Sequence, residues 1–264
     1  MAQVSASCHA CLQGLPMATA LAALPAPAVQ PSATRSLQGS RCLLEAPEPP
    51  SRRGNNFTKG ARWSPDGRVV LALNDDAILR LYQMPADKEG RDVGLKVNGP
   101  HDGSGSPALL TPYVEAPEGG AVLDFCFFPG FSLDFPASCC FLTSSHEHPI
   151  HLRDALGGEL RNTYRPYNNV DEVCHAFSLC FSVDGNKILA GFPQAIRVFD
   201  VQRPGRQTQE WLLSTRKGKG QKGIIGALAA APFSPGLYAA GSYNRSVCVY
   251  HQDSRGKYPS ARLA

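Results

Sequence analysis

The chain has 264 residues, 43% of them hydrophobic and 18% charged, with a formal net charge of +4. This length allows one substantial domain, and so small a net charge argues against a uniformly basic nucleic-acid-binding protein. No run of about 18 apolar residues occurs, so we expect no membrane span. The nine cysteines are an odd number spread along the chain, which favours free thiols in a reducing compartment over a secreted disulfide framework.

Residues 1–54 contain no aromatic side chain and are dominated by Ala, Pro and Ser. A segment of this composition lacks the apolar bulk that offsets the entropy of ordering, so we predict a disordered tail. An organelle transit peptide is an alternative, because the first acidic residue is Glu45. Against it, Arg35 and Arg41 are the only Lys or Arg residues before that position.

Four segments of the remaining chain share one pattern. A hydrophobic strand ends in an aromatic turn, and a second strand of small residues and a third, alternating strand follow. The turns are Trp63–Gly67, Phe128–Gly130, Phe181–Gly185 and Phe233–Gly236, and the third strands are 78–82, 150–154, 196–200 and 247–250. The aromatic residue and the end of the third strand are 19, 18 and 17 residues apart in the first, third and fourth repeats. This is the pattern of a β-propeller blade.

The sequence therefore predicts an all-β fold, a WD-repeat β-propeller in residues 55–264. Its four blades are expected near 55–85, 119–165, 171–215 and 223–264. Two third strands end in Asp154 and Asp200, where WD-repeat blades usually carry Trp-Asp, and the other two depart from this pattern. An all-β sandwich with accidental periodicity is the alternative.

The acids of the repeat and the one Gly-rich loop do not indicate an enzyme. Asp66 and Asp184 lie in Asp-Gly turns, where a short acid bonds to neighbouring backbone N–H groups, and we expect the same structural role for Asp154 and Asp200. Residues 218–223 superficially resemble a phosphate-binding loop but lack its Gly-Lys-Ser/Thr ending. We predict no catalytic residues and no cofactor.

Two groups of residues have side chains of the types that bind metals. Cys8 and Cys11 are spaced as half of a zinc site, but no second ligand pair lies at a suitable distance. His146, His148 and His151 form an H-x-H-x-x-H set, with the first two on a turn and the third on the next strand. Because these positions do not ensure convergence, we predict an exposed histidine turn and no metal.

The positive charge is concentrated in residues 203–222. This segment has a net charge of +5, which leaves the rest of the chain at −1. Strands of a blade alternate in direction, so their connections alternate between the two ends of the propeller. We expect Arg203 and Arg206 at one end. The opposite end is expected to gather the candidate RNA-binding residues Arg165, Tyr167, Arg216, Lys217, Lys219, Lys222 and Arg245.

Basic side chains for phosphates beside an aromatic ring for base stacking suit the recognition of single-stranded RNA. The alternative for residues 216–222 is a solvated Gly/Lys loop without a ligand.

Six segments, in order along the chain, carry a likeness to a known family: NNFTKGARWSPDG (55–67), DDAILRLY (75–82), HPIHLRDALGGELRNTYRPYN (148–168), SLCFSVDGNKILAGF (178–192), IRVFDVQRPGR (196–206) and GSYNRS (241–246).

Residues 55–256 resemble the telomerase Cajal body protein family, whose members are WD-repeat proteins that bind small Cajal-body RNAs and telomerase RNA. The resemblance implies a non-catalytic RNA-binding scaffold in the nucleus and its Cajal bodies. Its implied partners are these RNAs and the proteins of box H/ACA ribonucleoproteins, with no membrane and no small-molecule substrate. A protein-interaction platform without direct RNA contact is the alternative function.

The family's propeller has roughly seven blades, so the four expected here correspond to its N-terminal part. An open array exposes a strand edge, and a truncated product with impaired function is a further alternative. The family also carries His-Ile-Trp-Asp where this chain has residues 151–154, His-Leu-Arg-Asp. Because Arg153 replaces a packing Trp, we expect a weaker second blade.

Overall fold

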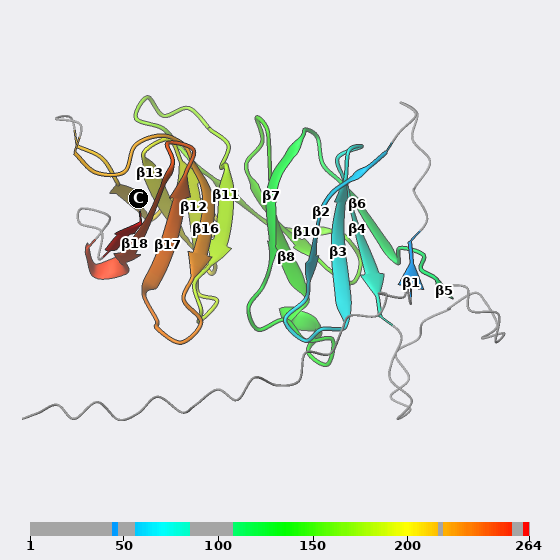
Figure 1. The fold of residues 1–264 in the computed structure, drawn as a ribbon. Helices are drawn as coiled ribbons and strands as arrows, with labels where there is room; N and C mark the ends of the chain where they lie inside the picture. Colours follow the sequence, from blue (N-terminus) through cyan, green and yellow to red (C-terminus); the bar gives the residue numbers. More distant parts are fainter. Residues whose placement is uncertain (1–43, 47–55, 85–107, 216–218, 255–260, 264) are drawn as a thin grey trace, which may run out of the picture. The chain divides into compact units, whose positions relative to one another are not determined.

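Four sheets of short strands follow one another along the chain and confirm the predicted propeller blades (Figure 1). The computed structural model describes residues 44–46, 56–84, 108–215, 219–254 and 261–263, all within the unit formed by residues 42–264. These residues contain no α-helix; the only helices among them are two 3-10 turns, η1 (Pro136–Ser138) and η2 (Gln252–Ser254). Neither is long and apolar enough to cross a membrane.

Each blade has four antiparallel strands, here lettered a to d in chain order. Blade one contains β2 (Thr58–Trp63), β3 (Val69–Asn74), β4 (Ile78–Gln83) and β6 (Val114–Pro117). Blade two contains β7 (Val122–Phe127), β8 (Cys140–Ser145), β9 (Ile150–Asp154) and β10 (Leu160–Arg165). Blade three contains β11 (Ser178–Phe181), β12 (Lys187–Phe192), β13 (Ala195–Asp200) and β15 (Gln209–Leu212). Blade four contains β16 (Ile225–Ala230), β17 (Leu237–Ser242), β18 (Ser246–His251) and β19 (Ala261–Leu263).

One connection leaves its own blade. The c–d link of blade three contains β14 (Gly205–Arg206), which pairs in parallel with β10 on the outer edge of blade two. Tyr164 lies opposite Gly205, and Arg165 lies opposite Arg206. An outer strand presents unpaired backbone groups, so this pairing covers part of an edge and ties the two blades together.

Neighbouring blades pack through three hydrophobic clusters. The first joins blades one and two, the second joins blades two and three, and the third joins blades three and four. In the middle blades β8 and β13 are buried along most of their length because they have a neighbour on both faces, while β17 of blade four is only partly buried. By contrast, β2 is exposed almost throughout, and Trp63 is 61% exposed.

Asp124 joins the a strands of three blades. Its carboxylate accepts hydrogen bonds from the Arg62 guanidinium on β2 at 2.7 Å and from the Leu179 backbone N–H on β11 at 2.7 Å. Burial raises the pKa of Asp124, and the charge of Arg62 opposes that rise. The a strands β7, β11 and β16 lie side by side, so this carboxylate helps set the spacing of the blades.

The turn aspartates have the structural roles expected of them. Asp66 accepts the backbone N–H of Arg68 at 3.1 Å and that of Leu133, in the next blade, at 3.0 Å. Asp184 likewise accepts the backbone N–H of Asn186 at 3.2 Å. These bonds stabilise the a–b turns, which start the second strand of each blade.

Arg153, which replaces the family's Trp in blade two, makes three hydrogen bonds. Arg153 donates to the Glu118 carboxylate at 2.7 Å, to the Gly158 carbonyl at 3.1 Å and to the Pro117 carbonyl at 2.9 Å. Pro117 is the last residue of β6 of blade one, and Glu118 follows it. Arg153 therefore links two blades by charge and hydrogen bonding in the place of an apolar ring.

The predicted tail, residues 1–54, lies outside the described residues apart from 44–46. There β1 (Leu44–Glu45) pairs in parallel with β5 (Ala108–Leu109). Cys8 and Cys11 also lie outside the described residues.

Candidate functional site

One end of the propeller is formed by the b–c turns and the d–a links, and we call it the bc end. Its b–c turns are 75–77, 146–149, 193–194 and 243–245, and its d–a links are 118–121, 166–177 and 213–224. A backbone hydrogen bond joins a turn to a link in every blade: Glu118 to Ala77, His146 to Ala121, Gln194 to Gly223 and Tyr243 to Ile224. The two kinds of connection therefore form one surface.

The b–c turn of blade four presents Arg245 to solvent. Arg245 has a φ of 58°, in the left-handed region, and the turns of the other blades place Ala77, Glu147 and Gln194 in the same conformation. This conformation costs a residue with a Cβ about 1–2 kcal/mol. Blade four thus carries an exposed guanidinium at a position where glycine would be less strained.

A buried glutamine holds the loop between β15 and β16 against blade four. The Gln221 side chain donates to the carbonyls of Ala240, at 2.8 Å, and Ser246, at 3.1 Å, and accepts the Tyr250 hydroxyl at 3.1 Å. Its neighbours Lys219 and Lys222 are exposed. The loop is therefore anchored at its centre, with a lysine on each side of the anchor.

The same loop packs closely on the turn that carries Arg245. The Ser242 hydroxyl donates to the Lys222 carbonyl. Gly223 has a φ of 85°, and a Cβ at this position would lie 2.8 Å from the Ser242 hydroxyl and 2.9 Å from the Cβ of Asn244. Only glycine permits this approach, which brings the segment of Lys222 beside the turn of Arg245.

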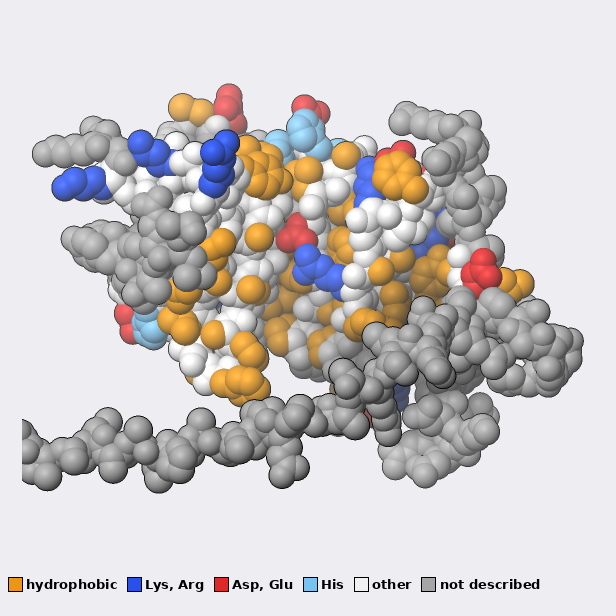
Figure 2. Space-filling view, viewed as in Figure 1, with side chains coloured by type: hydrophobic (Ala, Val, Ile, Leu, Met, Phe, Trp, Pro, Cys, Tyr) orange, Lys and Arg blue, Asp and Glu red, His pale blue; other side chains and the backbone are white. Residues whose placement is uncertain are grey.

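An aromatic side chain that the sequence analysis missed stands on this turn. Tyr243 is 71% exposed, and its ring covers Gly226, where a Cβ would collide with it. We call Lys219, Lys222, Tyr243 and Arg245 the basic corner. Figure 2 shows Lys and Arg side chains gathered at the upper left of the view, over blade four. The signal that could have found Tyr243 is an aromatic residue directly before Asn-Arg in a b–c turn.

Arg165 and Tyr167 belong to a different contact group. The Tyr167 backbone N–H donates to the Gln207 side chain at 2.9 Å, and the Gln207 amide donates to the Tyr167 carbonyl at 2.8 Å. The Arg206 guanidinium carbon lies 4.8 Å from the centroid of the Tyr167 ring. Within the described residues, no contact joins Tyr167 to Lys219 or Lys222.

The expected separation of Arg206 from Tyr167 is therefore wrong. Its position on a c–d link predicts the opposite end, but β14 pairs that link with β10 along the outer edge of blade two. There Arg206 also pairs with Asp171 at 2.6 Å. Arg165 is exposed at the end of β10, and Arg216 and Lys217 lie outside the described residues.

Known proteins resemble most of this chain. Telomerase Cajal body protein 1 of Rattus norvegicus is 38% identical over 205 residues, which are 77% of this chain and 36% of that protein. The chain belongs to the telomerase Cajal body protein family. The human protein of that name is 39% identical over 205 residues, 77% of this chain and 35% of its own length. The Drosophila melanogaster homologue is 36% identical over 168 residues, 64% of this chain and 29% of its own length.

This member of the telomerase Cajal body protein family thus spans about a third of the length of the relatives it matches. No family model matches the chain. The likeness to these relatives and the four observed blades agree on a WD-repeat protein of this family.

In this telomerase Cajal body protein relative, the three histidines of the H-x-H-x-x-H set separate. His151 pairs with Glu118 at 3.1 Å, while His148 contacts the His146 carbonyl at 2.8 Å. The His146 ring lies 4.5 Å from the ring of His175, and burial together with His146 lowers the pKa of His175. In the part of the chain that the structure describes, no three His, Cys, Asp or Glu side chains are grouped to hold a metal.

Proposed function

We propose that the basic corner binds single-stranded segments of small Cajal-body RNAs, including telomerase RNA, and that the chain is a scaffold without a catalytic step. The observation that carries this proposal is the anchored pair of exposed lysines beside Arg245 and the exposed ring of Tyr243. In this function the chain acts in the nucleus, directs its RNAs to Cajal bodies, and works with proteins of box H/ACA ribonucleoproteins. The names of its relatives support the telomerase and Cajal-body parts of the proposal.

The chemistry of the corner suits an RNA backbone with an unstacked base. Lys219, Lys222 and Arg245 offer three positive groups to phosphates, while Tyr243 offers a ring face. Stacking of a base on an aromatic side chain contributes about 1–3 kcal/mol, and it tolerates any base. Neither the positive groups nor the exposed ring needs a buried pocket to contact RNA.

A second contact for the same strand is proposed at Arg165 and Tyr167. Arg206 covers one face of the Tyr167 ring, and we propose that a base stacks on the other face. The basic residues Arg216 and Lys217 lie in the same loop as Lys219 and extend the proposed interface.

The test is a pair of charge-matched substitutions in the full chain, titrated with a labelled single-stranded loop of a small Cajal-body RNA. Lys222→Ala removes one exposed charge from the basic corner, and Arg203→Ala removes one exposed charge from the c–d link of blade three. We expect Lys222→Ala to weaken binding and to reduce the salt slope of log affinity by about 0.7, the value for one single-strand phosphate contact. Arg203→Ala should leave both unchanged.

Equal effects of the two substitutions would indicate that only net charge matters, and no effect of either would reject the proposed interface. A pull-down with ribonuclease tests the alternative function. Box H/ACA proteins that remain bound after RNA digestion would favour a protein-interaction platform without direct RNA contact.

A further inference from the structure

A second group of rings lies at the bc end, apart from the basic corner. The ring of His146, on the b–c turn of blade two, lies 4.5 Å from the ring of His175, and the ring of His175 lies 4.9 Å from that of Phe177. We call these three residues the aromatic rim. The His146 side chain is 53% exposed, and His175 and Phe177 are half-buried. The aromatic rim is therefore a row of neighbouring rings that solvent reaches.

Hydrogen bonds and packing join the aromatic rim to the basic corner. Phe177 directly precedes β11, and the Ser178 hydroxyl, at the first residue of β11, donates to the Ile225 carbonyl of β16 at 2.8 Å. The Tyr243 ring of the basic corner covers Gly226, the next residue of β16. Figure 2 shows His side chains at the upper edge of the view, to the right of the Lys and Arg side chains over blade four. The two groups are therefore parts of one surface.

The aromatic rim is suited to stacking rather than to binding phosphate. The Glu147 backbone N–H donates to Nδ1 of His175 at 3.4 Å, so this nitrogen carries no proton. Burial and the neighbouring His146 lower the pKa of His175, which keeps its ring neutral at pH 7. The exposed Glu147 carboxylate lies 3.8 Å from Nδ1 of His146, and its charge repels phosphate groups. The rim thus offers ring faces beside a negative charge.

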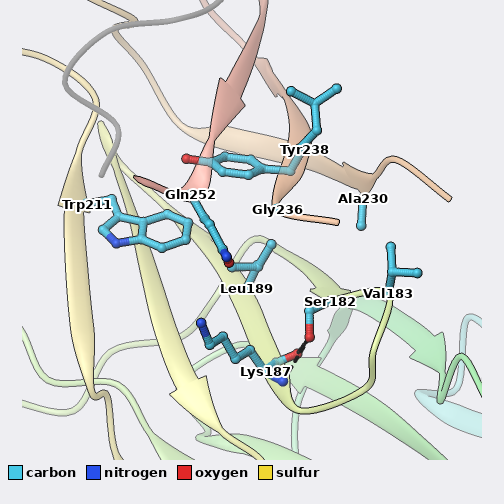
Figure 3. Close-up of a pocket in the computed structure, with 10 residues that line it drawn as sticks. Ser182, Val183, Lys187, Leu189, Trp211, Ala230, Gly236, Tyr238 and Gln252 are labelled. Atoms are coloured by element: carbon cyan, nitrogen blue, oxygen red, sulfur yellow. Dashed lines mark hydrogen bonds between the residues drawn. The ribbon is translucent and has the colours of Figure 1, made fainter. Parts of the chain in front are cut away.

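The aromatic stack between blades three and four does not offer such faces. Trp211 and Tyr238 lie 5.3 Å apart, and both are buried. They line a hollow at the opposite end of the propeller (Figure 3), which has a volume of about 20 Å³, room for about one water molecule. Phe233, at that end, is 95% exposed, but no other ring contacts it in the described part of the chain. Neighbouring rings that are open to a base are therefore a feature of the bc end.

We propose that the RNA strand held at the basic corner continues along the bc end to the aromatic rim, where its bases stack on His175 and His146. This inference rests on the proposed function of the basic corner. Lys219, Lys222 and Arg245 bind phosphates, whereas the rim contacts the faces of bases. Stacking on aromatic side chains, His and Phe included, is a usual mode of recognition for unpaired bases of RNA.

The first test titrates the full chain with the labelled single-stranded loop of a small Cajal-body RNA at several salt concentrations. We expect His175→Ala to weaken binding at least about fivefold, the lower end of the loss when a stacked ring is removed. The salt slope should not change, because no phosphate contact is lost. His175→Phe keeps a ring and should bind as the wild-type chain does. Phe233→Ala, which removes an exposed ring at the opposite end, should bind like the wild type.

The second test locates the stacked bases. The fluorescence of 2-aminopurine is quenched when this base stacks, so one 2-aminopurine is placed at each position of the RNA in turn. We expect two separate groups of positions to be quenched on binding to the wild-type chain. Tyr243→Ala should relieve one group and His175→Ala the other. A single quenched group, or relief of the same positions by both substitutions, would contradict a path from the corner to the rim.

Three results of the titration would overturn the proposal. These are a His175→Ala chain that binds as wild type, a lower salt slope in that chain, and a His175→Phe chain that binds as weakly as His175→Ala. Lys222→Ala separates this proposal from the proposed function. A loss of affinity in Lys222→Ala alone would keep the basic corner and reject the path to the rim, and a loss in His175→Ala alone would do the reverse. A wild-type chain that does not bind the RNA would reject both.

Discussion

Beside its hydrophobic cluster, the contact between blades one and two contains a buried ionic group, whereas the contact between blades three and four contains a stack of aromatic rings. In the first, the Glu118 carboxylate is 1% exposed and accepts hydrogen bonds from Thr143 at 2.6 Å and Arg153 at 2.7 Å, and it pairs with His151 at 3.1 Å. In the second, the rings of Trp211, Tyr238 and Tyr250 form a continuous stack. One repeat architecture therefore accepts two different chemistries at its blade contacts.

The c strands also carry chemically different residues at one equivalent position. Counted back from the strand end, this position holds Arg80, His151, Arg197 and Cys248 in the four blades. Arg80 and Arg197 each pair with a glutamate on strand d, Glu115 and Glu210, at 2.9 and 3.0 Å. Different side chains can therefore occupy this position, provided that they fill the space and that their polar atoms have hydrogen-bond partners.

Removing the indole at one end of the aromatic stack should have the largest effect. We expect Trp211→Ala to lower the free energy of unfolding by about 3–5 kcal/mol, because it leaves a cavity between two blades and deletes a ring contact. Urea unfolding of the full chain measures this. Trp63→Ala, at an exposed ring, should cost less than about 1 kcal/mol. A similar cost for both substitutions would mean that the stack is not what joins blades three and four.

Neutralising the ionic contact should have the next largest effect. We expect Glu118→Gln to lower the free energy of unfolding at pH 7 by about 3 kcal/mol, since Arg153 then stays largely buried without a counter-charge. The matched control is Glu115→Gln, because Glu115 pairs with Arg80 but is 53% exposed, and it should cost less than about 1 kcal/mol. Equal urea midpoints for the two variants would contradict this ranking.

Acid should distinguish the two contacts. Hydrogen bonds from His151, Arg153 and Thr143 outweigh the effect of burial and hold the pKa of Glu118 at about 2, below its usual value of 4.5. The ionic contribution is therefore complete above about pH 4.5 and is lost as the pH falls toward 2, which amounts to about 3 kcal/mol. Thermal melts across this range should show a decline that Glu118→Gln lacks and Trp211→Ala keeps. The same decline in all three chains would assign it to other carboxylates.

The smallest effect on stability is expected in the basic corner. Arg245→Gly relieves a left-handed backbone but adds chain entropy in the unfolded state, so the free energy of unfolding should change by less than about 1 kcal/mol. RNA binding by this variant should still weaken, with a salt slope lower by about 0.7. Weakened binding together with a large loss of stability would mean that Arg245 acts through the fold.

The blades and turns were predictable because their signals are local. The aromatic turns, the alternating third strands and the Asp-Gly turns each depend on a few neighbouring residues, as Asp66 and Asp184 show. The placement of Lys222 and Arg245 at one end followed from strand direction alone. Tyr243 could have been included by the same rule, since it precedes Asn-Arg in a b–c turn.

Other features depend on contacts between residues far apart in the chain. Arg206 meets Tyr167 only because β14 leaves blade three and pairs with β10, and no local pattern marks such an exchange. In the sequence, Gln221 is one polar residue in a Gly/Lys loop. Only the structure shows that its amide donates to carbonyls of β17 and β18. Residue order is enough to specify strands and turns, because hydrophobic alternation and backbone preference act over a few residues. Which side chains meet between blades depends on how the whole sheets pack.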